Sequence, residues 1–181
     1  EADTYLEGIR PLAEQGRLGG VLLQFPYSFH YTRDNRSYLA SLSGRLSGDG
    51  RVPLLVEFRN TEWNRSSVRE GLAGRNVGYV VTDSPDLPKL PEPESVVTAD
   101  TAYIRFHGRN RENWWTGDNT SRYDYLYSRD ELHDLLPIVK SLIRQSARLF
   151  IAFNNHYKGQ AAENAFMLRE LIEGKEREDR E

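Results

Sequence analysis

Five short apolar runs, each the length of a β-strand, constrain the fold of this chain more than any other feature. They occupy residues 21–25, 54–58, 79–82, 102–106 and 149–153. Each is rich in Val, Ile, Leu or aromatic residues and is apolar along most of its length. Such runs are typical of strands that are covered on both faces, as in a parallel sheet.

Capping signals and periodicity place helices between these runs. Ser128 and Glu131 form a capping box, and apolar residues then recur at helical spacing through 132–143. Pro137 lies inside this pattern and is expected to kink or split the helix. A second capping box joins Ser67 to Glu70.

Three further helices carry weaker signals. The first is expected over about residues 4–15, although Pro11 lies within it. An apolar stripe at 38–46 predicts a helix that is capped by Asp34 or Asn35. The last helix, over 161–172, is expected to stop at Gly174.

This alternation of strands and helices predicts an α/β fold with a parallel sheet. A chain of 181 residues suffices for one domain but not for two of ordinary size. We therefore expect a single domain over residues 1–174 and a charged tail at 175–181. The stretch 84–95 holds four prolines and is expected to be a stiff surface loop.

Composition excludes several classes of function. Lys and Arg number 24 against 27 Asp and Glu, so the net charge is −3, which excludes a wholly basic polyanion-binding surface. The absence of Cys removes disulfides, thiolate metal sites and a cysteine nucleophile. No apolar run approaches the roughly 20 residues of a membrane span. We expect a cytoplasmic protein without a membrane partner.

Every apolar run ends in polar or ionisable residues. Residues two apart in a strand share a face, so Glu57 should point the same way as Arg59, and Arg105 the same way as His107. Working residues of barrels and open parallel sheets lie at the carboxyl ends of strands. The alternative is that these residues only hydrogen-bond loops and close a barrel mouth. The residues concerned are Gln24, Glu57, Arg59, Asp83, Arg105, His107, Asn154 and Asn155.

The long loop after the fourth run, residues 107–127, combines Arg with aromatic residues. It contains Arg109, Arg111, Arg122, Trp114, Trp115, Tyr123, Tyr125 and Tyr127. Exposed aromatic and Arg side chains are typical of stacking or phosphate-binding surfaces. In the alternative interpretation the aromatic residues pack the core of a lid, and the Arg residues pair with Glu112, Asp118 and Asp124.

Small groups of residues suggest two further kinds of chemistry. Lys158, the Gly159 backbone and Arg105 could together hold an anion where the last helix starts. Glu57 and Asp83 could act as an acid and base pair if both face one cleft. No compact metal-ligand motif is present, so we assign no metal or cofactor. A divalent metal on His107, His156, Glu57 or Asp83 is left open as the alternative.

The chain resembles the YecE-like family, a group without an assigned function. The matching stretches are VLLQFPYSF at 21–29, VEFRNTEW at 56–63, Asp83, YIRFHGRNRENWW at 103–115, YDYLY at 123–127 and FNNHYKGQAAENA at 153–165. The resemblance implies a TIM-type (β/α) barrel with no settled activity. It also implies a shared set of polar and aromatic positions, which here are Gln24, Glu57, Arg59, Trp63, Asp83, Arg105, His107, Tyr125, Asn154, Asn155, Gln160 and Asn164.

The chain departs from this family in two respects. Asn60 stands where the family usually has a His, and Tyr27 stands where a second Pro often follows. A full barrel takes about 250 residues, and five strands do not close an eight-stranded circle. We therefore expect a partial barrel that lacks the first third of the family's domain. Its open sheet edges would favour self-association.

Two classes of function remain after these steps, and the sequence leaves open whether the chain is an enzyme. In the first, the chain is a hydrolase-like enzyme that acts on a phosphate- or sugar-bearing substrate. Its catalytic residues would be Glu57, Asp83 and His107. In the second, a non-catalytic module binds nucleic acid or another polyanion. Glycoside hydrolysis by Glu57 and Asp83 ranks last, because it rests on barrel analogy alone. The residues expected to bind substrate or anion are Gln24, Arg59, Trp63, Arg105, Arg109, Trp114, Trp115, Tyr125, Asn154, Asn155, Lys158, Gln160 and Asn164.

Overall fold

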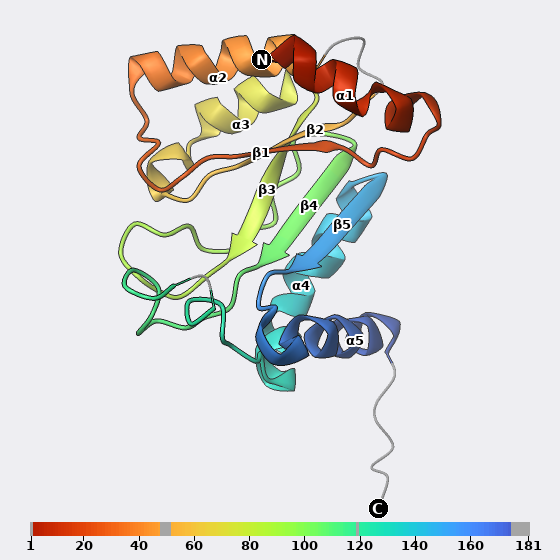
Figure 1. The fold of residues 1–181 in the computed structure, drawn as a ribbon. Coiled ribbons are helices and arrows are strands. Elements are labelled where there is room, and N and C mark those ends of the chain that lie inside the picture. Colours follow the sequence, from red (N-terminus) through yellow and green to blue (C-terminus); the bar gives the residue numbers. More distant parts are fainter. Residues whose placement is uncertain (1, 48–51, 119, 175–181) are drawn as a thin grey trace, which may run out of the picture.

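Five parallel strands form one curled sheet in a computed structural model that describes residues 2–47, 52–118 and 120–174 (Figure 1). The strands are hydrogen-bonded in chain order, and each pair is parallel. The predicted α/β class and parallel sheet are confirmed, in the form of a half-barrel with helices outside. The strands are β1 (Val21–Gln24), β2 (Leu54–Glu57), β3 (Val77–Asp83), β4 (Thr101–Phe106) and β5 (Arg148–Phe153).

Within the described ranges, five α-helices and two short 3₁₀ helices accompany the sheet. Helices α1, α2 and α3 lie beside β1 and β2 in Figure 1, and α4 and α5 lie beside β5. No helix within the described ranges is long and apolar enough to cross a lipid bilayer. The bounds are α1 (Ala2–Glu14), α2 (Arg33–Leu46), η1 (Thr61–Trp63), α3 (Ser66–Ala73), α4 (Arg129–Gln145), η2 (Tyr157–Gly159) and α5 (Gln160–Glu173).

The helix ends correct two of the predicted caps. Thr32, not Asp34 or Asn35, caps α2, and its side chain accepts a hydrogen bond from the Asn35 backbone N–H at 3.2 Å. The predicted capping box at Ser67 is wrong, because α3 begins at Ser66, two residues earlier than that box requires, and its N-cap residue Arg65 makes no side-chain cap. At the start of α2 several polar residues were candidate caps, and the extended backbone at Thr32 selects this residue.

The other helix signals fare better. The capping box of Ser128 and Glu131 is confirmed at the start of α4, and Gly174 ends α5 at φ 69°. Pro137 does not split α4, which runs on through it, and Pro11 lies inside α1. The proline lacks only one backbone donor, and the buried stripe of α4 maintains the helix on both sides of it. The predicted tail at 175–181 lies outside the described residues.

The segment 84–100, between β3 and β4, is the one break in the alternation. It contains no helix or strand among its described residues, as its prolines predicted. It is only partly a surface loop, because Leu90 and Val96 are buried.

The register of the sheet decides which residues share a face. Val56, Val77, Ile104 and Phe106 belong to the main core beneath the helices. The opposite, concave face carries an apolar hollow of about 400 Å³, which is lined by residues that include Leu22, Leu55, Tyr103 and Phe150. Polar residues follow on this face at the carboxyl ends of the strands.

Candidate functional site

The carboxyl ends of β1, β2 and β4 bring predicted site residues together on the concave face. Gln24 lies in register with Glu57, and Thr82 with Arg105. Because residues two apart in a strand share a face, Glu57 lies on the same face as Leu55, and Arg105 on the same face as Tyr103. We call this end of the concave face the mouth.

Glu57 is the centre of the polar cluster at the mouth. Its side chain is fully buried, and each of its carboxylate oxygens forms an ion pair with an arginine guanidinium group. Arg59 Nε donates to Glu57 Oε1 at 3.0 Å, and Arg105 Nη1 donates to Oε2. Arg105 also donates to Gln24 Oε1 at 2.5 Å and to Asn154 Oδ1 at 3.1 Å. These contacts fix the planes of both guanidinium groups.

The Glu57 carboxyl group is ionised at neutral pH. Burial by itself would raise its pKa, but the neighbouring His107 and the charges of Arg105 and Arg59 outweigh burial and lower the pKa from 4.5 to about 2. A carboxylate with so low a pKa is a firm partner for arginine and a weak general base.

His107 lies beneath the mouth and is buried. Burial is the main cause that lowers its pKa, so the imidazole is neutral at pH 7. The Asn154 amide lies 3.1 Å from Nδ1 and can donate to it, which leaves the proton on Nε2. Nε2 faces Glu57 Oε1 at 3.3 Å, although the geometry falls short of a good hydrogen bond. Both ring nitrogens are thus directed at protein groups.

The charge of the mouth is positive toward solvent. The side chains of Arg59 and Arg105 are 18% and 11% exposed, and that of Glu57 is 0% exposed. Two cations and one anion, with a neutral His107, give this cluster a net charge of +1. The positive groups therefore lie between the buried carboxylate and the solvent.

Aromatic residues border the mouth on the side of Arg59. Arg59 Nη1 donates to the Tyr123 hydroxyl at 3.4 Å, and the buried Trp114 packs edge-on against Tyr123. Its neighbour Trp115 is 51% exposed and meets Tyr27 edge-on, with ring centroids 4.8 Å apart. Tyr27 and Trp115 thus form an aromatic wall that joins the loop after β1 to the loop after β4.

Asn60 holds the Tyr27 segment in place. Its side-chain amide donates to the backbone carbonyls of Tyr27 and Phe29, at 2.7 and 3.1 Å. Its carbonyl oxygen accepts from the Glu62 N–H at the start of η1. Asn60 is therefore a buried anchor for the loop after β1.

Asp83 lies on the other face of the sheet. It is in register with Phe106, which belongs to the helix-side core, and not with Arg105. Arg109 binds both of its oxygens, with distances from 2.7 to 3.2 Å, and the Tyr127 hydroxyl donates to Oδ2 at 2.6 Å. The structure therefore does not bring Glu57 and Asp83 together as an acid and base pair.

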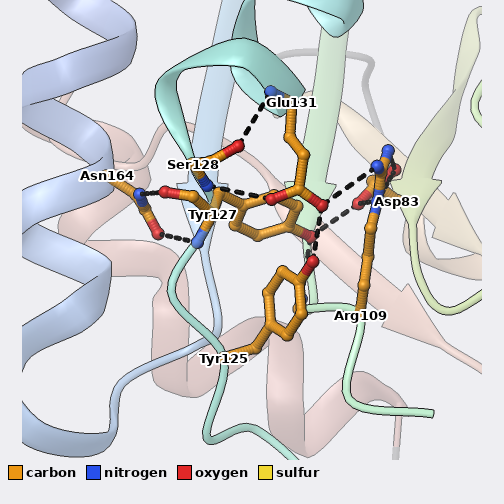
Figure 2. Close-up of polar contacts among 8 residues, drawn as sticks. Asp83, Arg109, Tyr125, Tyr127, Ser128, Glu131 and Asn164 are labelled. Carbon is orange, nitrogen blue, oxygen red and sulfur yellow. Dashed lines mark hydrogen bonds and ion pairs between the residues drawn. The ribbon is translucent and has the colours of Figure 1, made fainter.

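A second polar network extends from Asp83 to the start of α4 (Figure 2). Arg109 reaches Glu131 at 3.4 Å, and the Tyr125 hydroxyl donates to the same carboxylate oxygen at 2.5 Å. Burial and the adjacent Glu131 raise the pKa of Tyr125 to about 12, so it remains a donor. This network attaches loop 107–127 to the capping box of α4.

Three predicted ligand residues instead anchor this loop to α5 and to the segment after β5. Asn164 makes two hydrogen bonds to the Tyr127 backbone, at 3.1 and 2.8 Å. Gln160 accepts from the Tyr125 N–H at 3.0 Å, and Asn155 donates to the Tyr125 carbonyl at 2.8 Å. These contacts are internal and satisfy backbone groups of the loop.

Two other predicted residues lie apart from the mouth cluster. Trp63 is 1% exposed, stacks on Phe29 and Phe58 and donates from Nε1 to the Phe29 carbonyl at 2.6 Å. Its ring is packed in the main core, away from the mouth. Lys158 Nζ lies 4.7 Å from the centre of the Tyr157 ring, and no contact among the described residues joins it to Arg105.

Sequence reasoning gave Tyr27 and Glu131 no role in these clusters, and it named Tyr123 and Tyr127 only as aromatic residues of loop 107–127. Tyr123 and Tyr127 lie in the YDYLY motif, and Glu131 was noticed only as a capping residue. The strand-end rule reaches residues in or next to strands, and these four lie in loops or in a helix. The described residues contain no group of three or more His, Asp or Glu side chains that could hold a metal ion.

Known proteins are similar to this chain in fold and in sequence. The family described as "Protein of unknown function DUF72" matches residues 1–181. A crystal structure of a DUF72 family protein from Thermotoga maritima MSB8 superposes with a TM-score of 0.88 at 40% identity, covering 95% of this chain and 64% of that chain. One from Enterococcus faecalis V583 has a TM-score of 0.85 at 29% identity, covering 95% and 65%.

A curated relative agrees with these structures. The UPF0759 protein YunF of Bacillus subtilis (strain 168) is 29% identical over 182 residues, which are 94% of this chain and 64% of that protein. The chain thus spans a little under two thirds of the length of these relatives. The shared fold and the match along residues 1–181 show that the chain belongs to the DUF72 family.

Proposed function

We propose that the mouth binds a small anionic ligand that bears a phosphate or a sugar phosphate. One observation carries this proposal: two arginines, partly open to solvent, cover a single buried carboxylate. Arg forks that are already oriented by internal hydrogen bonds suit phosphate oxygens and lose little entropy on binding. Gln24, exposed at the rim, supplies a further polar contact.

The aromatic wall supports a ligand that is larger than the bare anion. Tyr27 and Trp115, on the loops after β1 and β4, offer ring faces and edges to a sugar or a base attached to the phosphate. The anion and the ring would then be recognised by different loops, after β1 and after β4.

Proton transfer is less well supported than binding. Glu57 is a weak base, His107 has both ring nitrogens directed at protein groups, and Asp83 is paired with Arg109 on the other face. A hydrolase-like reaction would need another group as its general base. We therefore assign Glu57 and His107 the role of positioning Arg59 and Arg105.

Polyanion binding is the second candidate. Exposed Trp115 and Arg111 on loop 107–127 favour it. Two observations count against polyanion binding. Arg109 is ion-paired with Asp83 and Trp114 is buried, so neither side chain is available to a polyanion.

Intrinsic fluorescence separates the two candidates, because Trp115 is exposed beside the mouth and two other Trp residues are buried. A sugar phosphate, a mononucleotide and a short single-stranded oligonucleotide are titrated at low and at moderate salt. Saturable quenching by the small phosphates at both salt concentrations is the expected result. Quenching by the oligonucleotide alone, lost steeply as salt rises, would contradict the pocket and favour the polyanion candidate.

A further inference from the structure

A second hollow lies away from the mouth, between α2 and α3 on the outer side of the sheet. Its volume is about 260 Å³. Since a water occupies about 30 Å³ in the liquid, the hollow has room for roughly nine atoms of water size. No residue of the mouth cluster lines it.

Small residues on the facing helices create this hollow. Ala40 and Ser43 of α2 lie across from Gly71 of α3. A Cβ atom added at Gly71 would meet only Arg75 Nη1, at 3.9 Å, so the space in front of it is open. Buried Leu39 and Leu72 form part of an apolar floor. Small side chains on α2 and α3 therefore leave this hollow, called the groove below, between the two helices.

The rim of the groove is cationic. Its lining includes Arg36 and Arg75 but no Asp or Glu among the described residues. Tyr31 lies at the end near Arg36 and is bracketed by Arg36 and Arg65, whose guanidinium carbons lie 5.0 and 4.6 Å from its ring centre. Hydrogen bonding to Ser67, followed by the positive charges of these arginines, lowers the pKa of Tyr31.

An apolar floor below a cationic rim matches one class of molecule. We propose that this groove binds a small amphipathic carboxylate, with an aromatic or branched aliphatic group on the floor and the carboxylate at Arg36 or Arg75. A neutral apolar molecule would leave the arginines without a counter-charge, and a bare anion would leave the floor in water. The proposal does not depend on the function of the mouth.

Phenylacetate is the probe, because it has the size and charge that the groove admits. Binding is followed by two-dimensional ¹H–¹⁵N NMR, which locates the site as well as the affinity. We expect saturable shifts at α2 and α3 with a dissociation constant in the millimolar range, as is usual for so small a ligand. Phenylacetamide, which lacks the charge, and acetate, which lacks the ring, should each bind several-fold more weakly.

Variants with matched controls test the assignment. Gly71→Leu fills the open space and favours the helix, so it should abolish binding while the fold is kept. Ala73→Leu, on an exposed position of α3 outside the groove, should leave binding unchanged. Arg36→Gln or Arg75→Gln should weaken phenylacetate binding about two- to fivefold, whereas Arg10→Gln should not.

Three outcomes would overturn the proposal. They are shifts that map to the mouth and vanish in Arg59→Gln, unchanged affinity in Gly71→Leu, and equal affinities for phenylacetate and phenylacetamide. The failure of phosphate binding at the mouth would leave this result unaffected, since the two sites share no residue.

Discussion

At the mouth, burial and neighbouring charges have opposite effects on the pKa values of Glu57 and His107. The Glu57 pKa of about 2 means that its ion pairs stabilise the fold fully above about pH 4.5. Protonation removes this stabilisation as the pH falls from 4.5 toward 2. The difference from the ordinary pKa of 4.5 corresponds to about 3 kcal/mol.

His107 gives the first pH prediction, in a range above that of Glu57. Its pKa is lowered in the folded chain, so only the unfolded chain takes up a proton as the pH falls below about 6.5. The free energy of unfolding should therefore fall between pH 7.5 and 5.5, with a contribution from His107 of at most about 1.4 kcal/mol per pH unit.

Urea denaturation of wild type and His107→Gln at several pH values measures this slope. The variant should show a flatter dependence on pH, whatever its absolute stability. His133→Gln, an exposed position on α4, is the matched control and should keep the wild-type slope. Equal slopes in wild type and His107→Gln would show that His107 protonates as readily in the folded chain as in the unfolded one.

Single residues also show where sequence reasoning succeeds and where it fails. The predictions that Glu57 shares a face with Arg59 and Arg105 with His107 agree with the contacts around Glu57, because alternation along a strand is local. The prediction that Asp83 might join Glu57 required the register between strands. Since β3 is buried along its whole length, hydrophobicity does not indicate which face Asp83 occupies.

At the level of elements, α4 tolerates a proline in its interior. Pro137 has no N–H to donate to the carbonyl four residues earlier, so one helical hydrogen bond is missing. The buried stripe of α4, which includes Leu132, Val139 and Leu142, maintains the helix across this gap. The sequence showed both the stripe and the proline, but it did not show that packing would prevail.

Pro137→Ala should raise the free energy of unfolding by about 1–3 kcal/mol, because alanine restores the donor and suits a helix. Pro137 is exposed, so the change should leave the core packing intact. Chemical denaturation measures the effect. Pro88→Ala in the loop between β3 and β4 is the control and should lower stability slightly, by up to about 1 kcal/mol. A Pro137→Ala protein no more stable than wild type would indicate that the helix is bent around the proline in a way alanine cannot follow.

For the molecule as a whole, the half-barrel leaves β1 and β5 each with one neighbour in the sheet. The alternation of apolar runs with helical patterns was sufficient to predict a parallel sheet, since each crossover returns the chain to start the next strand in the same direction. Curvature and the faces of the polar strand ends come from the twist and register of the assembled sheet, which no single run encodes.

The open edges and the apolar hollow near Phe150 predict self-association. Sedimentation velocity across a tenfold dilution series should show species larger than a monomer at the higher concentrations. Phe150→Glu, in the hollow, should reduce association, and Phe166→Glu, on exposed α5, should not. A monomer at every concentration would contradict this prediction.

The most direct test of anion binding at the mouth is a calorimetric titration of a sugar phosphate into wild type, Arg59→Gln and Arg144→Gln. Arg144 is exposed on α4, outside the mouth, and serves as the matched control. We expect saturable binding to wild type and to Arg144→Gln, and at least tenfold weaker binding to a folded Arg59→Gln protein, as for the loss of a charged hydrogen bond of about 1.5–3 kcal/mol. Equal binding to all three proteins, or binding to none, would contradict anion recognition by the mouth.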